Sequence, residues 1–111
     1  MNDNKNIYQN EDHLKLLRSV HNNPAASQRD LAKQMRMSLG KLNYLVKALI
    51  NKGLIKANNF SISKKKFNYI YLLTPKGLNH KINLTKKFMK IKIKEYNKLS
   101  KEIENVDSGR N

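Results

Sequence analysis

The spacing of apolar residues predicts a helix in the first part of the chain. Leucine and valine side chains recur at helical intervals after Glu11, which predicts a helix that ends at about His21. Pro24 interrupts this pattern, because the residue before a proline is driven out of the helical region. Residues 1–10 are polar and lack such spacing, so we expect them to form a flexible N-terminal tail.

Two capping patterns predict the next two helices. Ser27 and Asp30 form an S-x-x-D capping box, which predicts a short helix over Gln28–Met35. Ser38 is a second N-cap residue, and Gly53 suits the left-handed conformation that ends many helices, so a third helix is expected over 38–52. Its apolar residues share one face, which we expect to be buried: Leu42, Leu45, Val46 and Leu49.

The periodicity changes after this helix. Two segments rich in aromatic and β-branched residues, Leu54–Ile62 and Phe67–Leu73, predict two strands. The intervening residues, Ser63–Lys66, are basic, so the pair is expected to form a β-hairpin with a positively charged tip. The whole wing is expected over 61–68.

A long helix is predicted at the end of the chain. Thr74 is a suitable N-cap and Pro75 suits the first helical position. Between Pro75 and Val106 there is no other proline, and Gly77 is the only glycine. Residues 107–111 are expected to form a flexible tail. Nine positions alternate at intervals of four and three and define a heptad seam: Leu78, Ile82, Thr85, Met89, Lys92, Tyr96, Leu99, Ile103 and Val106.

This seam predicts a homodimer held by a coiled coil, because a helix longer than the rest of the domain cannot bury such a face alone. The alternative is that the helix folds back on its own domain. The residues expected to make the dimer contacts are Leu78, Ile82, Met89, Tyr96, Leu99 and Ile103.

Net charge favours a polyanionic partner. The chain has 23 Lys and Arg against 8 Asp and Glu, a net charge of +15, and no acidic residue occurs between Asp30 and Glu95. A field of one sign attracts nucleic acid or, as a second choice, an anionic membrane surface. The alternative is that the lysines only keep the chain soluble, which explains the missing acidic residues poorly.

The order of these elements is that of a mainly α winged helix-turn-helix domain, Glu11–Leu73, followed by a dimerisation helix over 74–106. In such a domain the third helix enters the major groove and the wing contacts the backbone or the minor groove. The residues expected to contact DNA are Gln28 and Arg29 before that helix, Ser38, Leu39, Gly40, Lys41, Asn43, Tyr44 and Lys47 on it, and Lys64, Lys65 and Lys66 in the wing.

Each of these residue types suits a contact with DNA. Gly40 lets the backbone come close, Asn43 can pair with adenine, and Tyr44 can contact a thymine methyl group or a phosphate. Lysines reach either guanine or phosphate. The alternative for any single residue is a plain solvated position.

Several classes of function find no support in the sequence. There is no cysteine, no nucleophile elbow, no glycine-rich phosphate loop and no metal-ligand spacing among His13, His21 and His80, so we expect no enzyme activity, metal or cofactor. There is no secretory signal or membrane span, so we expect a cytoplasmic protein that does not act in a membrane.

Two stretches, Ser27–Phe60 and Tyr69–Gly77, resemble the MarR family of transcriptional regulators. They are most similar to the compact branch linked to extracellular polysaccharide (EPS) loci. The segments SLGKLNYLVKALINKGLIK and LLTPKG support this likeness, which extends over about Asp12–Glu104. The resemblance implies a dimeric, sequence-specific DNA-binding repressor or activator with Ser38–Lys47 facing the major groove. We expect such a dimer to bind a pseudo-palindromic site.

Larger members of this family build the dimer from both chain ends and hold a small effector between the dimer and DNA-binding lobes. The N-terminal element here is short, which argues against a small-molecule effector. Two other functions remain open: a non-specific nucleic-acid-binding protein of nucleoid or RNA-binding type, and a winged-helix module that contacts another protein or an anionic membrane.

Overall fold

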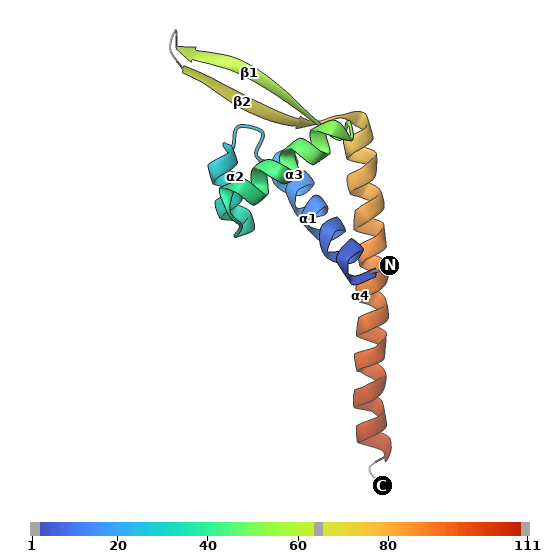
Figure 1. Ribbon diagram of the computed structural model, residues 1–111. Helices are drawn as coiled ribbons and strands as arrows, with labels where there is room; N and C mark the ends of the chain where they lie inside the picture. The colour runs from blue at the N-terminus through green and yellow to red at the C-terminus, as the bar shows by residue number, and fades with distance from the viewer. Residues whose placement is uncertain (1–2, 64–65, 110–111) are drawn as a thin grey trace.

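The computed structural model describes residues 3–63 and 66–109, with side chains over 10–58 and 70–107. These residues form a mainly helical winged helix-turn-helix domain with a long C-terminal helix, which confirms the predicted fold class (Figure 1). The elements are α1 Asp3–Asn22, α2 Gln28–Met35, α3 Leu39–Asn51, β1 Ile55–Ser63, β2 Lys66–Leu73 and α4 Pro75–Gly109.

The core lies where α1, α2 and α3 meet. The apolar face predicted for α3 is buried in full, with Leu42 and Leu49 entirely excluded from solvent. Leu16 and Leu17 of α1 and Leu31 of α2 are equally buried and pack in the same cluster. Burial of side chains of this size contributes about 1.5–3 kcal/mol each, so this cluster fixes the position of α3 in the domain.

The predicted caps of α2 and α3 are both confirmed. The Ser27 Oγ accepts a bond from the Asp30 amide, and the Ser27 amide donates to the Asp30 carboxylate, each at 3.1 Å. The bond from the Ser27 amide to the ionised carboxylate lowers the pKa of Asp30, and the Ser27 hydroxyl acts in the same direction. The turn between the two helices passes through Arg36 in the left-handed conformation, with φ 54°.

The hairpin is antiparallel, with Ile55 opposite Leu73 at its base and an irregularity in register between Ser61 and Ser63. Its base is held by the helical core, where Ile55 and Tyr71 are buried. The far end of the hairpin extends away from α4 (Figure 1). The wing therefore projects from the domain as a two-stranded arm.

The start of α4 is joined tightly to the end of α3. Thr74 Oγ1 donates to the Gly53 carbonyl at 2.6 Å and accepts from the Gly77 amide at 2.9 Å, so the predicted N-cap is confirmed. A side chain at position 77 would collide with the Leu54 carbonyl group, which explains the glycine there. Gly53 has φ 74°, the left-handed conformation expected at the end of α3.

The long helix has two different environments. Leu84 is buried against the core and Phe88 packs beside it, so the first half of α4 is attached to its own domain. The second half projects beyond the other elements and gives the molecule its extent of 76 × 27 × 25 Å (Figure 1). The first half of the helix therefore packs on its own domain, and the homodimer stays a prediction.

Two predicted tails are wrong over the residues that the structure describes. Helix α1 begins at Asp3 rather than at Glu11, because residues 3–10 contain no proline or glycine that would stop the helix from extending. Helix α4 continues past Val106 to Gly109 for the same reason. The N-terminal helix has 20 residues. The argument against a small-molecule effector assumed a short N-terminal element, so it no longer applies.

Among the described residues, the helices lack any stretch that is both long and apolar enough to cross a membrane.

One histidine lies inside the core. His13 of α1 is only 3% exposed, and its Nε2 atom is buried without a hydrogen-bond partner. Burial lowers the pKa of His13, and the charges of Lys52 and His80 act in the same direction. His80, on α4, also has a lowered pKa, because of burial and the nearby Lys52 and Lys76.

We expect the free energy of unfolding to decrease as the pH falls below about 6.5. In this pH range His13 binds a proton in the unfolded chain but stays neutral in the folded core, so protons favour the unfolded state. The free energy of unfolding stops decreasing once His13 is protonated in the folded protein as well. Replacing His13 by leucine should reduce this pH dependence between about pH 7 and pH 5, where Asp30 stays ionised because Ser27 lowers its pKa. Urea denaturation at several pH values measures the effect.

The exposed His21→Gln variant is the control, since it removes a histidine without changing the core. An unchanged pH dependence in the His13→Leu protein would contradict this role for the buried ring.

Candidate nucleic-acid interface

The outer face of α3 is open to solvent along its first three turns. Tyr44 is 70% exposed and Leu39 is 43% exposed, although both are large side chains. Gly40, Lys41 and Lys47 are exposed on the same helix. The face therefore combines an exposed aromatic ring with two cations, which together suit contact with the edges and phosphates of a nucleic-acid duplex.

Gly40 has no structural role that a larger residue would disturb. A Cβ atom built at this position meets no other atom within 4 Å, and the residue has an ordinary helical conformation. A glycine inside a helix costs about 0.5–1 kcal/mol relative to alanine. Neither packing nor backbone geometry requires this glycine, and without a side chain here the backbone of the first turn of α3 is left uncovered.

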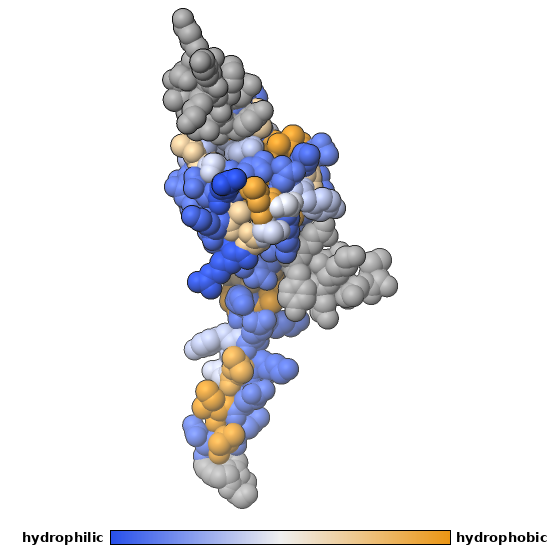
Figure 2. Space-filling model, turned by 60° about the vertical axis from the view of Figure 1, so that its left-hand side comes forward, coloured by the Kyte–Doolittle hydropathy of each residue, from blue (hydrophilic) through white to orange (hydrophobic). Residues whose placement is uncertain are grey.

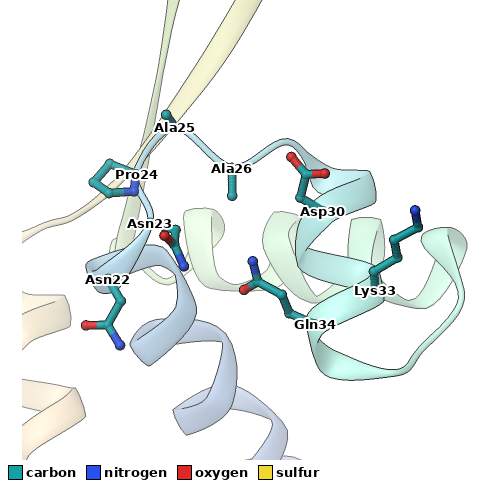
Figure 3. A pocket seen from close by; sticks show the side chains of 8 residues that line it. All are labelled: Asn22, Asn23, Pro24, Ala25, Ala26, Asp30, Lys33 and Gln34. Carbon is teal, nitrogen blue, oxygen red and sulfur yellow. The ribbon is translucent and has the colours of Figure 1, made fainter.

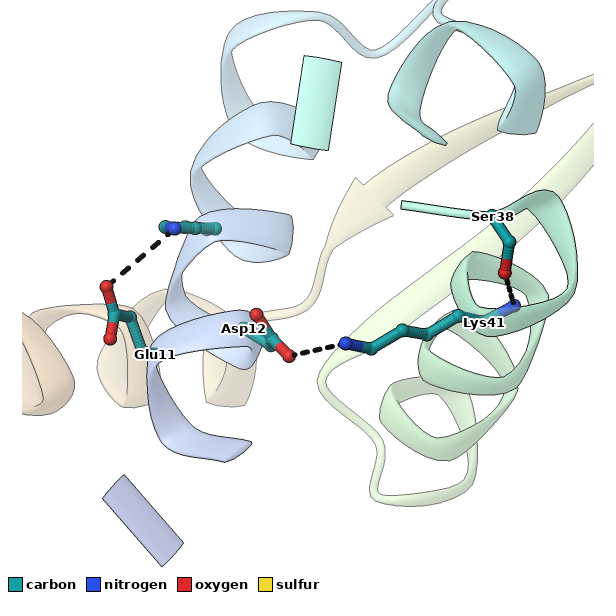
Figure 4. A network of polar contacts seen from close by, with 5 residues as sticks. Glu11, Asp12, Ser38 and Lys41 are labelled. Carbon is teal, nitrogen blue, oxygen red and sulfur yellow. Dashed lines mark hydrogen bonds and ion pairs between the residues drawn. The ribbon is translucent and has the colours of Figure 1, made fainter. Parts of the chain in front are cut away.

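Lys41 is held between two elements (Figure 4). Its amide donates to the Ser38 Oγ at 3.1 Å, which is the N-cap bond, and its Nζ lies 3.4 Å from the Asp12 carboxylate of α1. This ion pair orients the lysine on the surface, and it is weak because the Lys41 side chain stays 55% exposed, although that of Asp12 is only 28% exposed. A phosphate could compete for Lys41 at small cost.

A chain of side-chain hydrogen bonds links α3, α2 and β2. Asn43 Nδ2 donates to Gln28 Oε1 at 3.1 Å, and Gln28 Nε2 donates to the Tyr71 hydroxyl at 3.0 Å. Asn43 and Gln28 are half-buried. These bonds fix the angle between α2 and α3, so both residues have a positioning role that the sequence pattern did not indicate.

The other predicted DNA contacts are divided between described and undescribed parts of the chain. Arg29 is exposed at the beginning of α2, on the helix that precedes α3. Lys64 and Lys65 lie outside the described residues, and so does the side chain of Lys66, which begins β2. The contacts predicted for the wing therefore stay predictions.

Two residues that contact the predicted site residues were not predicted from the sequence. Asp12 pairs with Lys41, and Tyr71 accepts from Gln28, across separations of 29 and 43 residues along the chain. Neither residue has a local pattern that would distinguish it, since each follows the ordinary spacing of its helix or strand. Only the packing of α1 and β2 against α2 and α3 brings these groups together.

Several hollows lie outside the α3 face. A shallow one of about 500 Å³ lies at the connection between α1 and α2, where Asn23, Pro24, Ala26 and Gln34 border it (Figure 3). A second, of about 400 Å³, lies between α1 and α4 and is lined by Leu14, Phe88 and Met89 with Arg18 at its edge. Within the described part of the chain, no cluster of three or more acidic, histidine or cysteine residues could hold a metal ion.

The first 56 residues define the class of this domain. Residues 10–56, which comprise most of α1, all of α2 and α3 and the beginning of β1, match the family described as "Winged helix-turn-helix DNA-binding". This family is a non-enzymatic DNA-binding domain, in agreement with the expectation that the chain is not an enzyme. No curated protein shows significant sequence similarity to the chain.

Solved structures with the same fold cover nearly the whole chain. Staphylococcus aureus MarR in complex with salicylate and kanamycin has a TM-score of 0.57 at 17% identity, over 86% of this chain and 71% of that one. Streptococcus pneumoniae FabT in complex with DNA has a TM-score of 0.58 at 21% identity, over 88% and 68%. The S. aureus MepR–DNA complex has a TM-score of 0.60 at 16% identity, over 90% and 77%.

These similarities extend the shared fold into α4 and establish that the chain has the architecture of MarR-type regulators. The resemblance to that fold, expected from Ser27–Phe60 and Tyr69–Gly77, is confirmed. Its link to the compact EPS-associated branch stays a prediction.

Proposed function

We propose that this protein is a sequence-specific transcriptional regulator of the MarR family that binds double-stranded DNA as a homodimer in the cytoplasm. Residues 38–52 enter the major groove, and the wing over 61–68 contacts the phosphate backbone or the minor groove. The dimer binds a pseudo-palindromic site. The resemblance to the EPS-associated branch extends this proposal to polysaccharide-related genes as targets.

The observation that supports it most directly is the outer face of α3. Tyr44 is 70% exposed beside Lys47, and Gly40 leaves the backbone of the first turn uncovered. This face belongs to an interval of the chain without a single acidic residue, from Leu31 to Lys94. This combination of an exposed aromatic ring, an uncovered helical turn and a positive field supports contact with a groove of a duplex. It is harder to explain for a face that only contacts solvent.

Tyr44 and Lys47 are the strongest candidates for base contacts in this proposal. Asn43 is half-buried and its amide nitrogen is already bonded to Gln28, so it serves first to orient α3. The FabT and MepR relatives of this fold are in complex with DNA, which supports duplex DNA as the partner.

Two sets of variants separate base recognition from backbone attraction. We expect Tyr44→Ala to reduce the affinity for a preferred duplex about tenfold or more and the affinity for a random duplex much less, because base contacts carry the sequence preference. Replacing Lys64, Lys65 and Lys66 by glutamine should weaken both duplexes alike and lower the salt slope of the dimer, which has two wings, by about 6. Fluorescence anisotropy at several salt concentrations measures both effects.

The matched control for charge replaces three lysines of α4, Lys86, Lys87 and Lys90, by glutamine, and it should change the salt slope much less. If Tyr44→Ala weakened both duplexes equally, the protein would be a non-specific nucleic-acid binder. If no duplex bound at moderate salt, a protein-interaction module would be the better description.

A further inference from the structure

The heptad seam of α4 is exposed except at Thr85, which is half-buried. Ile82 and Met89, in the half of the helix that packs on its own domain, are 50% and 57% exposed, and Leu99 and Ile103, in the projecting half, are 59% and 63% exposed. Hydrophobic side chains gather on one side of the projecting helix in Figure 2. Leu84 and Phe88 attach α4 to its domain. In this half of the helix the seam residues Thr85, Met89 and Lys92 border the hollow between α1 and α4, so a partner helix on the seam would lie beside α1 there.

The charge along α4 is divided between its two halves. From Pro75 to Lys94 the helix carries seven lysines and no acidic residue. From Glu95 to Gly109 it carries four acidic residues and two lysines. Two copies that pack in parallel would place the basic halves side by side, whereas two antiparallel copies would place each basic half beside an acidic one.

We propose that the seam is covered by the α4 helix of a second copy of this chain, packed antiparallel in one defined register. In this register Leu78 lies opposite the partner's Ile103, Ile82 opposite the partner's Leu99, and Met89 opposite the partner's Lys92. Every seam layer from Leu78 to Ile103 then pairs in a two-fold symmetric, isologous contact.

The two polar seam residues fit the centre of this arrangement. The Thr85 hydroxyl donates to the Lys81 carbonyl within the helix at 2.7 Å, so its burial leaves no donor unsatisfied. It faces the partner's Tyr96, whose hydroxyl can bond to it. The Lys92 Nζ lies 3.7 Å from the Glu95 carboxylate of its own helix, so its stem can cover Met89 of the partner while its charge stays in solvent.

The residues that flank the seam distinguish the two orientations. Side chains at the flanking positions of a coiled coil set the orientation of the helices through their charges. In the antiparallel register Lys81 lies beside the partner's Glu102, and this attractive pair occurs twice in the dimer. In a parallel coiled coil Lys81 would lie beside the partner's Lys86, and Glu102 beside the partner's Asp107, so both pairs would repel.

The antiparallel contact places the two winged domains at opposite ends of the paired helices. The first residues of the two α4 helices are then about 46 Å apart, at ~1.5 Å per residue. Separation of this kind lets each domain contact its own half-site along a duplex. The inference rests on the homodimer of the proposed function, and it adds the orientation and the register of the helices.

Cysteine cross-linking tests the register directly, because the natural chain has no cysteine. A mixture of the Ile82→Cys and Leu99→Cys proteins, distinguished by a size tag, should form the mixed disulfide dimer upon oxidation. Ile82→Cys alone should form little disulfide dimer. The control is Lys90→Cys, whose position next to the seam residue Met89 faces solvent. Abundant Ile82→Cys self-dimer would overturn the antiparallel orientation.

Charge reversal gives an independent readout by sedimentation equilibrium. Lys81→Glu should weaken the dimer about tenfold or more, since it creates two repulsive pairs with Glu102, and adding Glu102→Lys should restore it. In a parallel dimer Lys81→Glu would instead strengthen association. A wild-type chain that sediments as a monomer would overturn both the register and the homodimer. DNA binding is measured in a separate experiment, and its result does not depend on the register or on the homodimer.

Discussion

Replacing Gly40 by glutamine is expected to stabilise the fold and to weaken DNA binding at the same time. Glutamine is a much better helix former than glycine, and a side chain at this position meets nothing within 4 Å, so the free energy of unfolding should rise by about 0.5 kcal/mol. The same side chain occupies the space above the first turn of α3. If DNA comes close to this turn, the affinity should fall about 100-fold, or close to 3 kcal/mol.

The opposite signs of the two effects make this prediction specific. Urea denaturation gives the stability and fluorescence anisotropy gives the affinity, on the same protein and at the same salt concentration. Glutamine is neutral, so electrostatic attraction to the duplex is unchanged. Gly40→Ala should stabilise the fold at least as much, because alanine is the better helix former, and it should weaken DNA binding less, because its side chain is smaller. A Gly40→Gln protein that binds DNA as well as the natural chain would show that the duplex does not approach the first turn of α3.

The second large effect is expected from the seam of α4. Replacing Leu99 and Ile103 together by glutamine should convert the dimer to a folded monomer, because these side chains are 59% and 63% exposed in the single chain and contribute little to its own core. We expect the affinity for a two-half-site duplex to fall about 100-fold or more, since the second domain no longer binds at a high effective concentration.

Sedimentation and circular dichroism measure the association and the helix content of this variant. The control replaces Asn97 and Asn105 by glutamine, on the solvent-facing side of the same helical turns, and should remain dimeric. Retention of the dimer by the Leu99→Gln, Ile103→Gln protein would place the dimer contact elsewhere. A dimer lost without loss of DNA affinity would show that one domain is sufficient for binding.

The elements of this chain were predictable because their signals are local. Caps such as Ser27 and Ser38 satisfy amides only three residues away, and the inward face of α3 follows directly from helical periodicity. The start of α1 was missed because residues 3–10 have weak helix formers but no residue that breaks a helix. Propensity alone decides such a boundary poorly, since tertiary packing can extend the helix.

The candidate site was predictable in its outline and less so in its details. Exposure of Tyr44 follows from its place opposite the buried face of α3. The hydrogen bonds from Asn43 to Gln28 and on to Tyr71 depend on how three elements pack, and periodicity within one element has no information about that. The same holds for His13, which has an ordinary helical position and becomes informative only through its burial.

In the proposed dimer, two identical domains are joined by the paired α4 helices, and each presents the uncovered first turn of α3 and an exposed tyrosine to DNA. The lysines attract any duplex, and they do so more weakly as the salt concentration rises. Sequence preference must come from the few side chains at the α3 surface, foremost Tyr44 and Lys47. This division of roles separates the proposed regulator from a protein that binds nucleic acid by charge alone.

Selection of bound sequences from a random duplex library, at near-physiological salt, tests this account most directly. The account predicts enrichment of an inverted repeat whose half-sites lie about 10 base pairs apart, or a multiple of that, as for other symmetric helix-turn-helix dimers. The Gly40→Gln protein should fail to enrich the same repeat. A bound pool with no common sequence, obtained with the natural chain at several salt concentrations, would contradict the proposed sequence-specific regulator.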